Sequence, residues 1–350
     1  MKQLGYYFFK YWALCGLNCY YRRIKTVGLE NIPKDKPVLF LSNHQNALMD
    51  VLLIATLSKR KPWYLTRADV FKSPFFRPLF HFLQMLPIYR IRDGKQNLFR
   101  NNAVFDKCGE ILCENGAILI FPEANHDLRR RVRPLSKGFT RIIENALENN
   151  PEMDLQLIPV GQNYQNATEM GDAAALYFGK PIPLKKHQGT KLDSLQLRAK
   201  VFERLKKLTT HIEPDDEYDE KLARLMELDP DFTNPIHINA FLRGRQVEQD
   251  IGLRKDGAGS FLRFLFYSVN LPLVFLWRLL LKPKVPEPEF MATYRFGFGM
   301  LVYPLFYLFI GLVLARVFEW KTACVTVILH AVLNFLLLKT MAPTSSVRRK

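Results

Sequence analysis

Cysteine is scarce in this chain of 350 residues, which contains five, an odd number that argues against a disulfide framework. The sequence also has no CxxC pair, no Walker-type phosphate loop and no histidine cluster with zinc spacing. Residues 1–21 have no clean apolar core followed by a small-residue cleavage site, so we expect no cleavable signal peptide. These absences predict reduced thiols in a protein facing the cytoplasm, without a metal or a bound cofactor.

Acidic residues are also few. The 33 Asp and Glu residues stand against 50 Lys and Arg, which gives a formal net charge of +17. A charge this positive predicts an anionic partner, which can be nucleic acid, an anionic membrane or a phosphorylated substrate. No nucleic-acid-binding motif accompanies the charge, and the C-terminal third is strongly apolar. We therefore expect membrane lipids, and not nucleic acid, as partners.

Three apolar segments without a charged residue lie in this C-terminal third: Phe264–Trp277, Phe296–Ala315 and Thr322–Leu338. The twenty residues of the second are about the length needed to cross the ~30 Å hydrocarbon core of a bilayer. We expect the second and third segments to span the membrane and the first, interrupted by Pro272, to be re-entrant or interfacial. The alternative is a buried helical hairpin of a soluble protein. The basic tail Val347–Lys350 favours the cytoplasmic side.

The N-terminal residues 1–25 are rich in aromatic side chains and end in a group of cations. This composition is typical of a helix in the membrane interface, with aromatic rings at headgroup level and cations on anionic lipid. An ordinary amphipathic helix that covers a soluble core is the alternative. With the C-terminal segments, the helix predicts a membrane protein whose active site faces the cytoplasm.

Residues 26–190 alternate between strand-like and helix-like segments, which predicts an α/β domain with active residues at strand ends. The expected strands are Val38–Leu41, Pro62–Thr66, Leu86–Arg90, Ala117–Phe121, Leu155–Val160 and Ala174–Phe178. The expected helices are Leu48–Leu57, Pro74–Met85, Asn97–Glu114 and Gly138–Leu147. Residues 191–259 are expected to form a soluble helical extension that ends in a hinge at Gly257 and Gly259, and residues 260–350 a membrane-embedded segment.

His44 and Asp50 directly follow the apolar run Val38–Leu41. A histidine held by a carboxylate can take a proton from an alcohol at neutral pH, with the carboxylate orienting the ring and stabilising the imidazolium. Alone the pair is a weak signal, because a strand-end histidine and a first-turn carboxylate also occur for structural reasons. Three further motifs follow it along the chain: Leu86-Pro87-Ile88-Tyr89-Arg90, Ile120-Phe121-Pro122-Glu123-Ala124-Asn125-His126 and Leu157-Ile158-Pro159-Val160-Gly161.

Arginine in the second motif suits a phosphate, because its planar guanidinium offers a fork of donors to phosphate oxygens. We expect Arg90 to bind an acceptor phosphate, with Arg92 as a second candidate that would share its face of a strand. The alternative is a solvated basic edge. A further basic run, Arg129–Arg131 with Arg133 and Lys137, could attract the phosphates of a co-substrate, contact anionic headgroups or be a solvated loop.

The four motifs in this order resemble the glycerolipid acyltransferases of the lysophosphatidic acid acyltransferase type, over roughly residues 30–185. The resemblance implies transfer of a fatty acyl group from acyl-CoA or acyl carrier protein to a glycerol-phosphate acceptor, with His44 as the base. The expected acceptor is 1-acyl-sn-glycerol-3-phosphate, which gives phosphatidic acid. Glycerol-3-phosphate is an alternative acceptor, and a non-catalytic lipid-binding membrane protein is the alternative function.

The resemblance also implies that Glu123 holds the glycerol part of the acceptor, that Asn125 beside it contacts the substrate, and that Pro159 shapes a strand end near the acyl chain. His126 is expected to be a polar neighbour and not a second base. The chain departs from the family pattern at three places. Five residues, not four, separate His44 from Asp50, and Gln84 and Ala124 stand where relatives have glycine. If the backbone at Ala124 needs a positive φ, alanine costs roughly 1–2 kcal/mol there.

Overall fold

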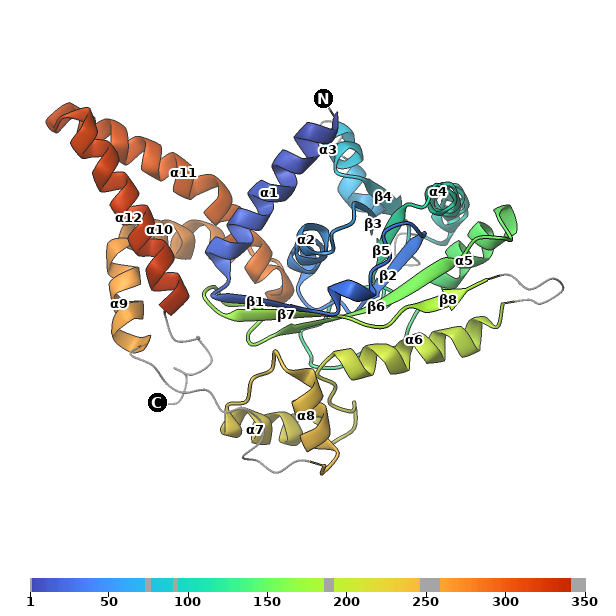
Figure 1. Ribbon diagram of the computed structural model, residues 1–350. Helices are drawn as coiled ribbons and strands as arrows, with labels where there is room; N and C mark the ends of the chain where they lie inside the picture. Colours follow the sequence, from blue (N-terminus) through green and yellow to red (C-terminus); the bar gives the residue numbers. More distant parts are fainter. Residues whose placement is uncertain (1, 73–76, 91–93, 186–191, 246–258, 341–350) are drawn as a thin grey trace.

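The computed structural model describes residues 2–72, 77–90, 94–185, 192–245 and 259–340. A mixed sheet of eight strands forms the centre of this part of the chain (Figure 1). Its order is β1-β7-β6-β2-β5-β3-β4, and β8 pairs with β6. The strands are β1 (Arg23–Val27), β2 (Val38–Ser42), β3 (Pro62–Arg67), β4 (Met85–Ile88), β5 (Ala117–Ile120), β6 (Leu155–Tyr164), β7 (Ala173–Phe178) and β8 (Ile182–Leu184).

The five strands β6, β2, β5, β3 and β4 are parallel to one another, whereas β7 runs antiparallel to β6. Their carboxyl ends therefore meet at one edge of the sheet. Open parallel sheets bind ligands at this edge, because the loops that leave it are free to carry functional side chains. All four motifs of the sequence lie on strands of this parallel set or directly after them.

Helices cover both faces of the sheet, and alternate strand residues face the two layers. Leu39 and Ile118 pack against α4, α5 and α6, whereas Phe40 and Leu119 pack against α1 and α2. These helices are α1 (Lys2–Tyr20), α2 (Ala47–Leu57), α4 (Asn101–Cys113), α5 (Gly138–Asn149) and α6 (Ser194–Leu208). The other helices of this part are α3 (Arg77–Phe82), α7 (Tyr218–Leu228), α8 (Pro235–Leu242) and the 3-10 helices Leu29–Asn31, Ala68–Lys72 and Lys95–Arg100.

The predicted α/β class is confirmed, and each of the six expected strands is present with shifted ends. Strands β1 and β8 were not expected. β1 contains Arg23 and Lys25, which we expected at the end of the N-terminal helix, and β8 is only three residues long. The expected strand Leu86–Arg90 ends at Ile88, so Arg90 lies beyond it. Strand β6 continues to Tyr164, which puts Pro159 in its middle, opposite Leu41, and not at a strand end.

The extension after residue 191 is not separate from the sheet, because α6 contributes Leu197, Val201 and Leu205 to one of its two cores. Helices α7 and α8 form a small core of their own below the sheet in Figure 1. The predicted hinge residue Gly257 lies outside the described residues, and Gly259 begins α9.

The C-terminal part consists of α9 (Gly259–Val269), α10 (Leu271–Leu276), a π-helical turn (Trp277–Leu281), 3-10 turns (Lys282–Lys284 and Pro288–Phe290), α11 (Met291–Val317) and α12 (Trp320–Thr340). Pro288–Val317 and Trp320–Thr340 are long and apolar enough to cross a membrane. The segment before them bends by 84° at Asn270, between α9 and α10. Length and composition thus agree with the prediction of two spans preceded by a bent segment. The basic tail Val347–Lys350 lies outside the described residues.

Candidate active site

His44 leaves the carboxyl end of β2, and Asp50 lies in the first turn of α2. The Nδ1 atom of His44 is 2.7 Å from Oδ2 of Asp50, whose side chain is fully buried. The same Oδ2 accepts hydrogen bonds of 2.8 Å from the backbone N–H groups of Gln45 and Asn46. These two donors stabilise the ionised carboxylate, which in turn favours the tautomer with a proton on Nδ1. The unprotonated Nε2 is then available as a base.

Tyr164 completes the support of Asp50. Its hydroxyl donates a hydrogen bond of 2.5 Å to Oδ1, the other carboxylate oxygen. Burial and the neighbouring carboxylate raise the pKa of Tyr164 well above its ordinary value, so the phenol stays protonated and remains a donor. The expected strand Leu155–Val160 ends four residues before Tyr164, so no sequence signal pointed to its hydroxyl as a support for Asp50.

The imidazole of His44 stacks on the ring of Phe121, with centroids 4.0 Å apart and planes 16° from parallel. The ring of His126 meets it edge-on at 5.6 Å. Only 15% of the His44 side chain is exposed. The stacked rings and the bond to Asp50 together restrict rotation of the imidazole, which keeps Nε2 in one direction.

Glu123 of the third motif is buried and pairs with Arg133 from the basic run. The guanidinium contacts Oε2 through Nη2 at 2.7 Å and through Nε at 3.0 Å, and the backbone N–H of Arg133 donates to Oε1. Burial raises the pKa of Glu123 to about 7, although Arg133 opposes the shift. Arg133 also donates to the carbonyl and the side chain of Asn125 and reaches the carbonyl of His44 at 3.5 Å. Arg133 therefore holds the loop of the third motif against the first.

Arg130 of the same basic run is structural as well. It donates to the backbone carbonyls of Tyr164 and Gln165, each at 2.8 Å, and lies over the ring of Phe232. Burial lowers its pKa to about 10. None of the three interpretations of the basic run includes these contacts. The sequence shows that Arg130 and Arg133 are cations, but it does not show that Arg130 bonds backbone carbonyls or that Arg133 meets the buried Glu123.

Both glycine departures fall where the backbone has a positive φ. Ala124 has a φ of 67° and Gln84 a φ of 60°. Side chains beyond glycine are disfavoured in this region, because Cβ approaches the following carbonyl. The structure therefore confirms that the backbone at Ala124 needs a positive φ, and this chain carries strain at both positions.

The remaining predicted residues lie at different places. Asn125 is exposed and lies beside Glu123. Arg133 contacts both Asn125 and the carbonyl of His44, so the structure brings Asn125 close to the His44–Asp50 pair. Arg90 follows β4 at the same edge of the sheet, 3.9 Å from Asp69, but three strands away from β2. At about 4.8 Å per strand this is roughly 14 Å. Arg92 lies outside the described residues.

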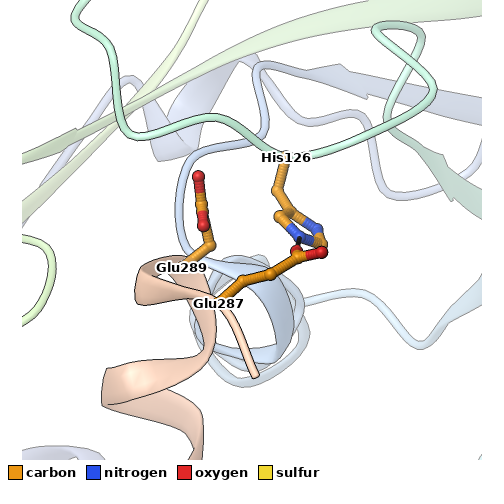
Figure 2. A group of neighbouring side chains, drawn as sticks. All are labelled: His126, Glu287 and Glu289. Carbon is orange, nitrogen blue, oxygen red and sulfur yellow. Dashed lines mark hydrogen bonds and ion pairs between the residues drawn. The ribbon is translucent and has the colours of Figure 1, made fainter. Parts of the chain in front are cut away.

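A wall of this site comes from the C-terminal part of the chain (Figure 2). Nε2 of His126 is 3.0 Å from a carboxylate oxygen of Glu287, and its ring meets Phe290 edge-on at 4.8 Å. His126, Glu287 and Glu289 have ligand atoms within 4.8 Å of one another, so they could hold a metal ion. The expectation that the chain binds no metal stays a prediction. About 160 residues separate the two segments, and no sequence signal joined them.

A family model described as Acyltransferase matches residues 23–162. Glycerol-3-phosphate O-acyltransferase 1 of Saccharomyces cerevisiae is 28% identical over 85 residues, which are 24% of this chain and 11% of the relative. An uncharacterized acyltransferase of Schizosaccharomyces pombe is 30% identical over 81 residues, 23% of this chain and 12% of the relative.

A 1-acyl-sn-glycerol-3-phosphate acyltransferase of Chlamydomonas reinhardtii is 24% identical over 181 residues, 51% of this chain and 48% of the relative. The crystal structure of the 1-acyl-sn-glycerophosphate acyltransferase PlsC from Thermotoga maritima matches with a TM-score of 0.39 and 18% identity, over 52% of this chain and 69% of that one. The chain thus spans half or less of the length of these curated relatives. The family match and the ordered motifs together show an acyltransferase domain at residues 23–162 of this chain.

Proposed function

We propose that the protein is a membrane-bound O-acyltransferase that uses His44 as its general base. The observation that carries the proposal is the support of Asp50 by three donors besides His44, two backbone N–H groups and the Tyr164 hydroxyl. A fully buried carboxylate with this support can orient one imidazole and stabilise its protonated form. A protein that only binds lipid does not need such an arrangement.

In the reaction, Nε2 of His44 takes the proton of the acceptor hydroxyl while the oxygen attacks the thioester carbonyl of the donor. The new C–O bond gives a tetrahedral intermediate, which collapses as the C–S bond breaks. The imidazolium then returns its proton to the leaving thiolate, so the enzyme ends in its starting state. Asp50 stays ionised throughout and stabilises the imidazolium.

The acceptor that we propose is 1-acyl-sn-glycerol-3-phosphate, with phosphatidic acid as the product. A relative from C. reinhardtii bears the corresponding name. Arg90, with Arg92, would bind the acceptor phosphate at the end of β4, and Glu123 and Asn125 the glycerol part beside His44. Pro159 lies in the middle of β6, so it would not touch the reacting groups but would shape the wall around the acyl chain. The donor would be acyl-CoA or acyl carrier protein.

Glycerol-3-phosphate is the second candidate acceptor, because the S. cerevisiae relative is named for it. For either acceptor we place the site on the cytoplasmic side. The carboxyl end of α12 returns to the acyltransferase domain, where Lys339 donates to the backbone carbonyl of Tyr21 at 2.9 Å. The basic residues that follow α12 favour that same side being cytoplasmic.

The test uses membranes that contain wild-type, His44→Ala or His237→Ala protein. His237 lies on α8 in the extension, so its variant controls for loss of a histidine as such. Labelled acyl-CoA or acyl carrier protein is supplied with either acceptor, and the lipid products are separated. We expect His44→Ala to lose at least about 100-fold in turnover, with His237→Ala unchanged. Equal product from His44→Ala and wild type, or no product with any donor and acceptor, would overturn the proposal.

A further inference from the structure

A cavity of about 560 Å³ lies where α1 meets the C-terminal helices α9, α10, α11 and α12. These helices are on the left of Figure 1, beside the sheet. The volume is within the range of about 300–1,000 Å³ that is usual for small-molecule sites. The sheet contributes only Glu169 and Met170, from the loop between β6 and β7, to the lining, and none of His44, Asp50, Glu123 and Arg133 lines it.

Apolar and aromatic side chains form most of the cavity wall. Phe266, Leu273 and Phe296 are among them, and each is buried. Helix α11, which contributes one side of the wall, is one of the two helices that can cross a membrane. An apolar wall between such helices suits a hydrocarbon chain, which can pack on it through dispersion contacts.

Cations line the same cavity. They are Arg263, Arg278, Lys282 and Arg295, against one carboxylate, Glu169. Glu169 pairs with Arg295 at 3.0 Å, and the lining as a whole has more cations than carboxylates. Arg278 and Lys282 are exposed, one turn apart, at the end of the bent segment, and Arg278 lies over the ring of Tyr267. A single anionic group at this rim would meet both cations.

We propose that this cavity binds one anionic glycerophospholipid, with an acyl chain between α1 and α11 and the phosphate on Arg278 and Lys282. A phospholipid has both groups that this lining can bind, a long apolar chain and a negatively charged headgroup beside it. The bound lipid would fill the space between α1 and the C-terminal helices. This inference does not depend on acyl transfer, because its site shares no residue with the catalytic centre.

Two glycines of α11 provide a matched test. Gly299 lines the cavity and Gly297 does not, and a Cβ added at either would meet no atom within 4 Å. Gly299→Leu should therefore fill the cavity, whereas Gly297→Leu makes the same chemical change to the helix outside it. Lipid retained by the full-length protein is measured by native mass spectrometry after release from nanodiscs of dioleoyl phosphatidylglycerol or dioleoyl phosphatidylcholine.

We expect wild type and Gly297→Leu to retain one phosphatidylglycerol and Gly299→Leu to retain at least tenfold less. Phosphatidylcholine, which has the same chains and no net charge, should be retained weakly by all three. The proposal is overturned if Gly299→Leu retains phosphatidylglycerol as wild type does, or if the two lipids are retained equally.

The cationic rim is tested separately, in case Gly299→Leu fails to fold. Replacing Arg278 and Lys282 together with glutamine should weaken phosphatidylglycerol binding by roughly 25-fold, at about fivefold for each cation. Lys284→Gln is the control, because Lys284 is an exposed cation two residues on that does not line the cavity. Equal loss in the double variant and the control would show a general effect of surface charge and sink the assignment.

The chain also carries its own probes of occupancy. Cys15 and Cys19 line the cavity, whereas the exposed Cys113 ends α4 in the acyltransferase domain. Maleimide labelling, followed by peptide mass spectrometry, should be slower at Cys15 and Cys19 in phosphatidylglycerol than in phosphatidylcholine, with Cys113 unchanged. An unchanged labelling ratio between the two lipids at all three thiols would count against a bound lipid.

Discussion

At the scale of single residues, the hydrogen bonds that hold Asp50 are more distinctive than the His44–Asp50 pair itself. Asp50 is fully buried, and Tyr164 holds its second oxygen from a strand 114 positions away in the chain. We predict that Tyr164→Phe lowers turnover by about tenfold with little change in KM and costs roughly 1.5–3 kcal/mol of stability, because a hydrogen bond to a buried charge is lost. Steady-state kinetics and thermal unfolding measure the two effects.

Tyr21→Phe is the control for this change. Tyr21 is fully buried next to Tyr164, with ring centroids 6.2 Å apart, and its hydroxyl has no hydrogen-bond partner among the described residues. Its loss should leave turnover unchanged and stability equal or higher. Similar losses in both variants would mean that the hydroxyl of Tyr164 has no special part in holding Asp50.

Glu123 makes stability depend on pH. Its pKa is about 7 in the folded chain against an ordinary 4.5, so the folded state binds the proton more tightly than the unfolded state. Stability from this group is therefore highest below about pH 4.5 and falls as the pH rises through the window to about 7, by an amount on the order of 3 kcal/mol. Glu123→Gln should flatten the fall of melting temperature between pH 5 and 8, and an unaltered slope would refute the shift.

The strained backbone at Ala124 predicts a stabilising substitution. Ala124→Gly should raise the free energy of unfolding by about 1 kcal/mol, because glycine adopts a φ of 67° without the Cβ penalty. The same change at Ala199, exposed in the interior of α6, should instead cost about 1 kcal/mol. Thermal unfolding of both variants checks the two signs, and a loss of stability in both would contradict the strain.

The sequence predicts residues whose partners are near in the chain better than those whose partners are distant. His44 and Asp50 are six positions apart, so one motif contains the pair and its chemistry. Tyr164 reaches Asp50 only because β6 pairs with β2, and a register of strands cannot be read from one sequence. The sequence shows Arg133 as one cation of a basic run, but its pairing with Glu123 depends on how the loop after β5 folds.

At the scale of elements, the longer apolar strands were predicted well, whereas the polar edge strand β1 and the three-residue β8 were missed. β2 and β5 are continuous buried runs, which is the usual pattern of a central parallel strand. β1 has the sequence RIKTV with alternating exposure at the edge of the sheet, so its cations were assigned to a membrane-facing helix end instead. Edge strands give a weaker hydrophobic signal because only one face is covered.

Polar contacts also join the C-terminal helices. Asn334 of α12 bonds Asn270 at the bend between α9 and α10 and the hydroxyl of Tyr307 on α11. We predict that Asn334→Leu loosens these helices and lowers stability by about 0.6–2 kcal/mol in detergent or nanodiscs. Thr326→Val on the same helix is the control, since its hydroxyl bonds only the Thr322 carbonyl of its own helix. Melting temperatures that fall equally in the two variants would exclude a joining role for Asn334.

At the scale of the whole molecule, the division into soluble and membrane parts is less clean than the sequence indicates. Ala292 and Phe296 at the start of α11 belong to the same core as β2 and α2. Composition separates these segments, because α11 has the length and the hydropathy of a membrane span. Hydropathy reports where a helix can lie, but it does not show which of its residues also pack on a neighbouring domain.

The hairpin of α11 and α12 is held to the acyltransferase domain at both of its ends. Phe290 meets His126 at the start of α11, and Lys339 bonds the backbone at Tyr21 and Arg22 at the end of α12. A hairpin that crosses a bilayer with both ends tied in this way cannot swivel beneath the domain. Nε2 of His44 would then keep one height above the lipid surface, and the lipid acceptor that we propose would arrive by lateral diffusion in two dimensions.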